Sequence, residues 1–81
     1  MRSAVHAHAT VTAVGPGNVR INRVTQWRVR YRYQDQLGRE HEGRSPHLAP
    51  EEGEIWTQGD TANIKFDPQR PGKSVWLGKE A

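Results

Sequence analysis

The heptapeptide at residues 27–33 constrains the fold of this chain more than any other segment. Aromatic and aliphatic residues alternate there with arginine, in the order Trp-Arg-Val-Arg-Tyr-Arg-Tyr. Side chains two residues apart lie on the same face of a β-strand, whereas a helix would distribute them around its axis. The segment therefore predicts a strand with one apolar face and one cationic face. The apolar face consists of Trp27, Val29, Tyr31 and Tyr33, and the cationic face of Arg28, Arg30 and Arg32.

Four other segments predict strands, which brings the number of strands to five. Residues 4–14 and 61–66 also alternate between apolar and polar side chains, and this period of two is typical of half-buried strands. A return strand to about residue 45 and a last strand at 74–77 complete the set. Glycine and proline at 15–18 predict a break after the first strand, because glycine permits positive φ and proline lacks a donor N–H. Residues 19–24 alternate again, which is compatible with a ribbon that extends into the second strand. Alternation in the first strand places Val5, Ala7, Ala9, Val11 and Ala13 on one face.

The turn between the second and third strands is predicted at residues 35–38, Asp-Gln-Leu-Gly, where glycine suits a left-handed position. We favour a register that keeps both glutamates of the return strand on the arginine face, because a slip of one residue would send them to the aromatic face. The pairs expected to oppose each other are Tyr33–Arg39, Arg32–Glu40, Arg30–Glu42, Val29–Gly43 and Arg28–Arg44.

A short helix is predicted to begin at Pro50, because proline suits the first helical position and the acids Glu51, Glu52 and Glu54 suit its positive end. Gly59-Asp60 limits it to one or two turns. A helix between the third and fourth of five strands is the connectivity of an OB-fold barrel, and an SH3-like barrel has similar lengths. We therefore expect residues 1–81 to form a single all-β domain with one short helix, a small five-stranded OB-like or SH3-like barrel. The expected core consists of Val29, Tyr31, Ile64, Phe66 and Leu77, with Trp56 from the helix.

Composition narrows the classes of protein that fit. The chain has no cysteine, which excludes disulfides and thiolate metal sites. No stretch approaches the roughly 20 apolar residues of a transmembrane helix, and no signal peptide follows Met1, so we expect a soluble chain. The net charge is +3, but residues 1–33 contain six arginines and no acid, whereas residues 34–67 contain eight acids and three bases. Such asymmetry is typical of a surface that binds an anionic partner, or of strands whose charges meet on folding.

Several short motifs together resemble a bacterial family of domains of unknown function. They are the Tyr31-Arg32-Tyr33 run, the Gly59-Asp60 step and the ending Phe66-Asp67-Pro68-Gln69-Arg70-Pro71, and the resemblance covers about residues 9–78. Members of that family read V-x-Y-x-Y, then G, then G-D, then V-x-Y-D-P-x-x-P; here Phe66 replaces the usual tyrosine. The family's β domain is often found beside transmembrane helices, so the resemblance implies a small β domain with a membrane association. It implies no activity.

The candidate chemical sites have plain structural explanations. His6 and His8 share one strand face as a metal pair would, but two histidines at this spacing also suit exposed strand positions, and we expect no metal or other cofactor. Asp60 and Asp67 stand beside glycine and proline, where aspartate stabilises turns. No nucleophile motif or phosphate-binding glycine loop is present. We therefore expect no enzymatic activity.

The arginines carry the remaining functional hypotheses. The leading one is a non-catalytic interaction or accessory module with a protein partner, associated with a membrane as the resemblance implies. The alternative is an OB-like module that binds single-stranded nucleic acid, because strands 2 and 3 of an OB-fold supply the binding face and the arginines lie there. The residues expected to bind an anionic partner are Arg20, Arg23, Arg28, Arg30, Arg32 and Arg44.

Overall fold

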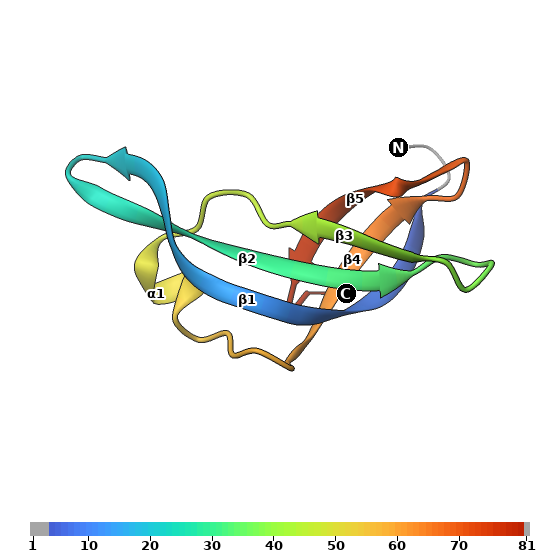
Figure 1. Ribbon diagram of the computed structural model, residues 1–81. Helices are drawn as coiled ribbons and strands as arrows, with labels where there is room; N and C mark the ends of the chain where they lie inside the picture. Colours follow the sequence, from blue (N-terminus) through green and yellow to red (C-terminus); the bar gives the residue numbers. More distant parts are fainter. Residues whose placement is uncertain (1–3, 81) are drawn as a thin grey trace.

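The computed structural model describes residues 4–80 and contains five antiparallel strands in one sheet, ordered β3-β2-β1-β4-β5, with one short helix between β3 and β4 (Figure 1). The prediction of an all-β chain with five strands and one helix is therefore confirmed. The edge strands β3 and β5 are not paired with each other, so the sheet is not closed. The elements are β1 (Val5–Ile21), β2 (Val24–Gln34), β3 (Glu40–Arg44), α1 (Pro50–Gly53), β4 (Thr61–Asp67) and β5 (Arg70–Gly78).

The central strand β1 contains a bulge at Thr12, where the register with β2 shifts by one residue between Val11 and Ala13. An extra residue in one strand reverses which side chains face the core. Ala9 and Val11 are buried before the bulge, whereas Ala13 is exposed and Val14 packs against the core after it. The expectation that Ala13 shares a face with Ala9 and Val11 was wrong for this reason. Val5 is 40% exposed, at the start of the strand.

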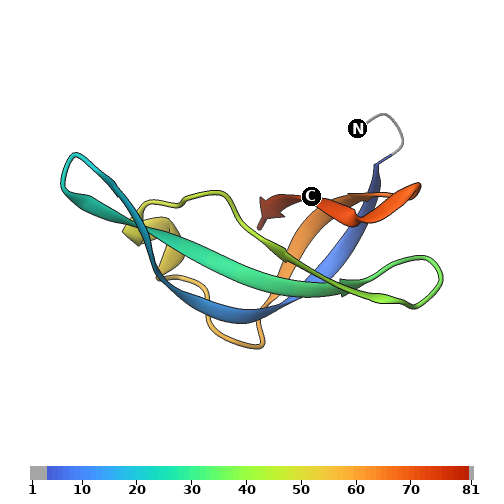
Figure 2. The same cartoon turned by 45° about the horizontal axis from the view of Figure 1, so that its top comes forward.

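The first strand does not break at residues 15–18. It continues to Ile21, and the chain reverses at Asn22 and Arg23, whose positive φ angles of 50° and 66° are those of a type I′ hairpin turn. The predicted break was wrong because the glycines and proline are accommodated by an irregularity in the β1–β2 pairing between Pro16 and Arg20. The hairpin consequently projects beyond the rest of the sheet, as Figures 1 and 2 both show. We call residues 17–26 the arm.

The β2–β3 hairpin has the predicted turn but a register shifted by two residues. Gly38 is left-handed with φ of 76°, and the Asp35 N–H donates to the Arg39 carbonyl, so the loop is only three residues long. Glu40 and Glu42 lie on the arginine face as expected, but the predicted pairs were wrong. The observed pairs are Arg30–Arg44, Tyr31–Gly43, Arg32–Glu42, Tyr33–His41 and Gln34–Glu40.

Steric fit at Gly43 explains this register. A Cβ atom at residue 43 would lie 2.6 Å from the ring of Tyr31, far inside van der Waals contact. Only glycine can therefore stand opposite Tyr31 while that ring is buried. In the predicted register Glu42 would face Arg30 and Gly43 would face Val29. Because valine is smaller than tyrosine, the space left by the absent side chain of Gly43 would not be filled.

The segment after β3 follows the predicted order. Pro50 occupies the first turn of α1, with Glu51 and Glu52 beside it, and the helix is a single turn. The Asp67–Arg70 pairing makes the turn between β4 and β5 tighter than predicted, so β5 begins at Arg70 and not at residue 74. A second shift in β5, between Trp76 and Gly78, leaves Leu77 only partly buried and outside the core clusters. Leu77 was expected in the core, and Trp76 takes that place.

The core consists of two clusters on the inner face of the curled sheet, and Trp76 packs against both. Val29, Tyr31, Ile64, Phe66 and Trp56 are buried as predicted, although Trp56 follows the helix. The sheet is open between β3 and β5, and side chains of β2 reach β5 across the curled inner face: the Tyr31 hydroxyl lies 2.7 Å from Ser74 Oγ, and the Tyr33 hydroxyl donates to the Pro71 carbonyl. The inner face of the sheet therefore forms the core. One cluster contains Ala9, Tyr31, Tyr33, Ile64 and Phe66, and the other Val11, Val29, Leu48, Trp56 and Ala62.

Candidate anion-binding surface

Three of the predicted arginines meet on the outer face where β2, β3 and the base of the arm come together. Arg30 and Arg44 are direct cross-strand partners, and Arg28 is the next residue on the same face of β2. Two like charges directly opposite each other destabilise a sheet unless an anion lies across them. The like-charge pair expected at Arg28 and Arg44 is therefore present two residues along, at Arg30 and Arg44.

These arginines line an open hollow of about 510 Å³. Residues 13–19 of β1 form its floor, and Arg28, Arg30, Arg44 and His47 surround it. A Cβ at Gly15 would meet no atom within 4 Å, so no other side chain fills the space above the main chain there. We call this feature the arginine hollow. Its wall is cationic and its floor is neutral, which suits a carboxylate or phosphate ligand.

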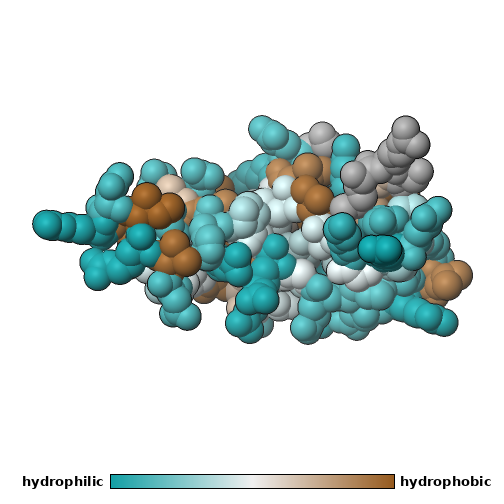
Figure 3. All heavy atoms as spheres, turned by 90° about the horizontal axis from the view of Figure 1, so that it is seen from above, coloured by the Kyte–Doolittle hydropathy of each residue, from teal (hydrophilic) through white to brown (hydrophobic). Residues whose placement is uncertain are grey.

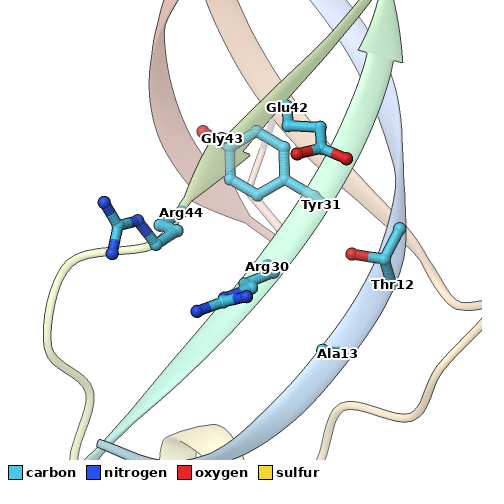
Figure 4. A pocket seen from close by; sticks show the side chains of 7 residues that line it. All are labelled: Thr12, Ala13, Arg30, Tyr31, Glu42, Gly43 and Arg44. Carbon is cyan, nitrogen blue, oxygen red and sulfur yellow. The ribbon is translucent and has the colours of Figure 1, made fainter. Parts of the chain in front are cut away.

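No acid of the described chain forms an ion pair within 4 Å with an arginine of the arginine hollow. Among residues 4–80, ion pairs within 4 Å form only between Arg32 and Glu40 and between His41 and Asp35. Glu42 shares a second open depression with Arg30 and Arg44, but Figure 4 shows its carboxylate directed away from both guanidinium groups, which extend to the same side. The hollow therefore keeps its positive charge.

Arg28 has an additional unsatisfied group. Its Nε atom is buried and has no hydrogen-bond partner within the described part of the chain. A buried donor on a charged group without a partner costs about 1–3 kcal/mol or more, so native structures rarely keep one without a reason.

The other three predicted arginines lie elsewhere. Arg32 is on the same strand face but pairs with Glu40 at 3.7 Å, with both side chains more than half exposed. Arg20 and Arg23 are at the end of the arm, where Arg20 donates to the Arg23 carbonyl at 3.3 Å. The structure therefore groups Arg28, Arg30 and Arg44 and separates them from the rest.

The aromatic side chains do not share the arginine face. Tyr31 and Tyr33 are 1% and 3% exposed, and burial raises the pKa of both phenols. Phe66 stacks on Tyr33, and Trp76 packs against Tyr31. Proteins that bind single-stranded nucleic acid stack the bases on exposed aromatic side chains. The aromatic side chains named here pack in the core, so they provide no stacking surface at the arginine hollow.

The carboxylates with defined partners stabilise turns. Asp35 accepts from the main-chain N–H groups of Leu37 and Arg39 and lies 2.8 Å from His41 Nε2; the His41 hydrogen bond is the main reason that the Asp35 pKa is lowered. Asp60 accepts from the Thr57 N–H and Asp67 from the Gln69 N–H. Asp60 and Asp67 therefore act in turns, as their sequence context predicted.

The histidine pair on β1 does not gather further ligands. His6 and His8 have ring centroids 5.6 Å apart, and their cross-strand partners are Lys65 and Asn63. Within residues 4–80, no group of three or more histidine, aspartate or glutamate side chains is placed to hold a metal ion.

Two parts of the arginine hollow were missed by sequence reasoning. His47 lies in the loop after β3 and shows no local signal, because only folding brings it beside β2. Residues 15–18 were predicted to break the first strand, although they belong to the floor of the hollow. A Gly-Pro-Gly sequence inside a long alternating strand is the signal that would have indicated exposed main chain.

No helix in the described part of the chain is long and apolar enough to cross a membrane. A scan against protein-family models, a search of curated proteins and a search of solved structures each found no match to this chain.

Proposed function

We propose that this protein is a non-catalytic interaction module that binds an acidic segment of a partner protein at the arginine hollow. The observation that carries the proposal is the meeting of Arg28, Arg30 and Arg44 around one hollow with no acid within 4 Å in residues 4–80. Guanidinium groups bind carboxylates with paired, charge-assisted hydrogen bonds. The Arg28 Nε is buried without a hydrogen-bond partner among residues 4–80, so the guanidinium cluster also contains an unsatisfied donor.

Within this proposal we favour the OB-like barrel over the SH3-like one. The helix lies between β3 and β4, β1 pairs with both β2 and β4, and side chains of β2 reach β5 across the curled inner face. The outer face of β2 and β3 is the usual ligand face of an OB-fold, and the arginine hollow occupies that face.

Single-stranded nucleic acid is the second candidate for the same surface. The arginines favour it, since each phosphate contact releases counterions. The burial of Tyr31 and Tyr33 disfavours it, because sequence-tolerant binding of single strands depends on stacked bases as well as on charge. An acidic protein segment needs only the guanidinium groups, so it is the better fit.

The test compares two variants that each lose three positive charges. Arg28→Ala/Arg30→Ala/Arg44→Ala removes the hollow, whereas Arg39→Ala/Arg70→Ala/Lys73→Ala removes three exposed charges outside it. Fluorescence anisotropy with a labelled glutamate-rich peptide should show affinity about 10- to 100-fold lower for the first variant, since each tenfold is about 1.4 kcal/mol. The second variant should stay within about threefold of the wild type, because distant charges act only through screened long-range attraction.

Two results would overturn the proposal, and circular dichroism serves as the folding control. Equal losses in both variants would show that only net charge matters, and the proposal would be wrong. Tighter binding of an oligothymidine than of the peptide, lost in the first variant alone, would assign the hollow to nucleic acid. Circular dichroism should show both variants folded, since all six side chains lie outside the buried core.

A further inference from the structure

The arm projects from the sheet and carries three of the seven large apolar side chains that are exposed in the described part of the chain. None of its residues, 17–26, is buried. Val19, Ile21 and Val24 are 36%, 54% and 45% exposed. Figure 3 shows brown, hydrophobic spheres among teal ones at this end of the molecule. Large apolar side chains gathered on an exposed ribbon indicate a contact surface, because isolated hairpins gain nothing from exposing them.

The apolar side chains of the arm lie on the same face as the arginines. Ile21 and Val24 are direct cross-strand partners, so their side chains lie on one side of the ribbon. The irregularities in the β1–β2 pairing add residues to β1 and none to β2. Alternation along β2 is therefore uninterrupted and places Val24, Arg28 and Arg30 on one face. Val19 also lines the arginine hollow itself. The apolar surface is thus continuous with the cationic one.

Charge identifies the kind of occupant. Residues 15–30 contain four arginines and no acid. A second copy of the arm would bring like charges together, which costs several kcal/mol per misplaced pair at an interface. An occupant with acidic residues beside apolar ones matches both parts of the surface.

We infer that the partner is an acidic segment with a flanking apolar stretch, and that it lies along the outer face of the arm. Its carboxylates enter the arginine hollow, and its apolar side chains cover Ile21 and Val24. This inference rests on the proposed function and adds the partner's chemistry and its direction of binding. The arm then acts as a preformed strand pair against which the segment packs.

The experiment uses two labelled peptides and two matched variants of the whole protein. One peptide carries glutamates only, and the other carries the same glutamates followed by leucine and phenylalanine. Ile21→Thr/Val24→Thr removes the apolar pair while keeping β-branched residues at strand positions. Ile55→Thr/Val75→Thr is the control, because Ile55 and Val75 are comparably exposed, at 53% and 47%, and lie outside the arm.

The peptide with leucine and phenylalanine should bind the wild type about tenfold more tightly than the glutamate-only peptide. Burial of about two methylene groups is enough for an affinity gain of that size. Ile21→Thr/Val24→Thr should lose this advantage and leave the affinity for the glutamate-only peptide within about twofold. The control variant should retain both affinities.

The outcomes separate this inference from the proposed function. If both peptides bind equally and the arm variant changes nothing, the arm inference is overturned while the arginine hollow stands. If neither peptide binds in a manner that depends on Arg28, Arg30 and Arg44, the proposed function fails first. Self-association of the wild type that disappears in the arm variant, measured by analytical ultracentrifugation, would assign the arm to a second copy and would also overturn the inference.

Discussion

Phe66→Ala should destabilise the protein by about 3–5 kcal/mol, which is comparable with the whole stability of so small a domain. Phe66 is 2% exposed, stacks on Tyr33 with ring centroids 5.7 Å apart and belongs to the cluster that contains Ile64. Truncation to alanine removes the stacking on Tyr33 and leaves a cavity, because the surrounding side chains relax only in part. We expect the variant to melt more than about 12 °C below the wild type, or to be unfolded at 25 °C.

Phe66→Leu is the control for this prediction. Leucine keeps most of the apolar volume and loses mainly the stacking on Tyr33, so its melting temperature should lie between those of the wild type and the alanine variant. Thermal unfolding followed by circular dichroism measures both. A Phe66→Ala variant that melts within a few degrees of the wild type would show that Phe66 is not in the core as described.

Gly43→Ala should also cost about 1–3 kcal/mol, although it adds only one methyl group. The new Cβ would lie 2.6 Å from atoms Cε1, Cζ and Oη of Tyr31. Tyr31 cannot move aside freely, because it is 1% exposed, packs against Trp76 and is hydrogen-bonded to Ser74. Either β3 moves away from β2 or the tyrosine leaves its place in the core.

Gly15→Ala is the matched control, since a Cβ at Gly15 meets nothing within 4 Å. Its effect on the free energy of unfolding should stay within about 0.5 kcal/mol, as for other exposed sites. Chemical unfolding in urea measures both variants. Equal stabilities for Gly43→Ala and Gly15→Ala would contradict the register in which glycine faces Tyr31.

Patterns of period two predicted the strands and their faces well. The alternation of residues 27–33 placed Tyr31 and Tyr33 inside and Arg30 outside, because which face a side chain occupies depends only on odd or even position. Glu40 and Glu42 of β3 also lie on the predicted face, since a register error of two residues leaves every side chain on the same face of the sheet. The helix at Pro50 followed from local preferences of proline and acidic residues.

Features that depend on contacts between distant residues were not predictable in this way. The register of the β2–β3 hairpin is determined by the fit of Gly43 against the Tyr31 ring, which no local pattern records. Two bulges, at Thr12 and near Leu77, change which residues face the core. The arginine hollow is formed by residues from β1, β2, β3 and the following loop, so the sequence predicted its arginines but not its floor or His47.

The claim that an acidic segment binds at the arginine hollow is tested most directly by mapping the contact in solution. Uniformly ¹⁵N-labelled protein would be titrated with the unlabelled glutamate-rich peptide, and the amide shifts followed by NMR. We expect the largest shifts at residues 13–19, 28–30 and 44–47, together with the Arg28 Nε–H signal, and small shifts at residues 67–75 on the far turn. Shifts concentrated at residues 67–75, or spread evenly over all exposed basic residues, would contradict the proposed site.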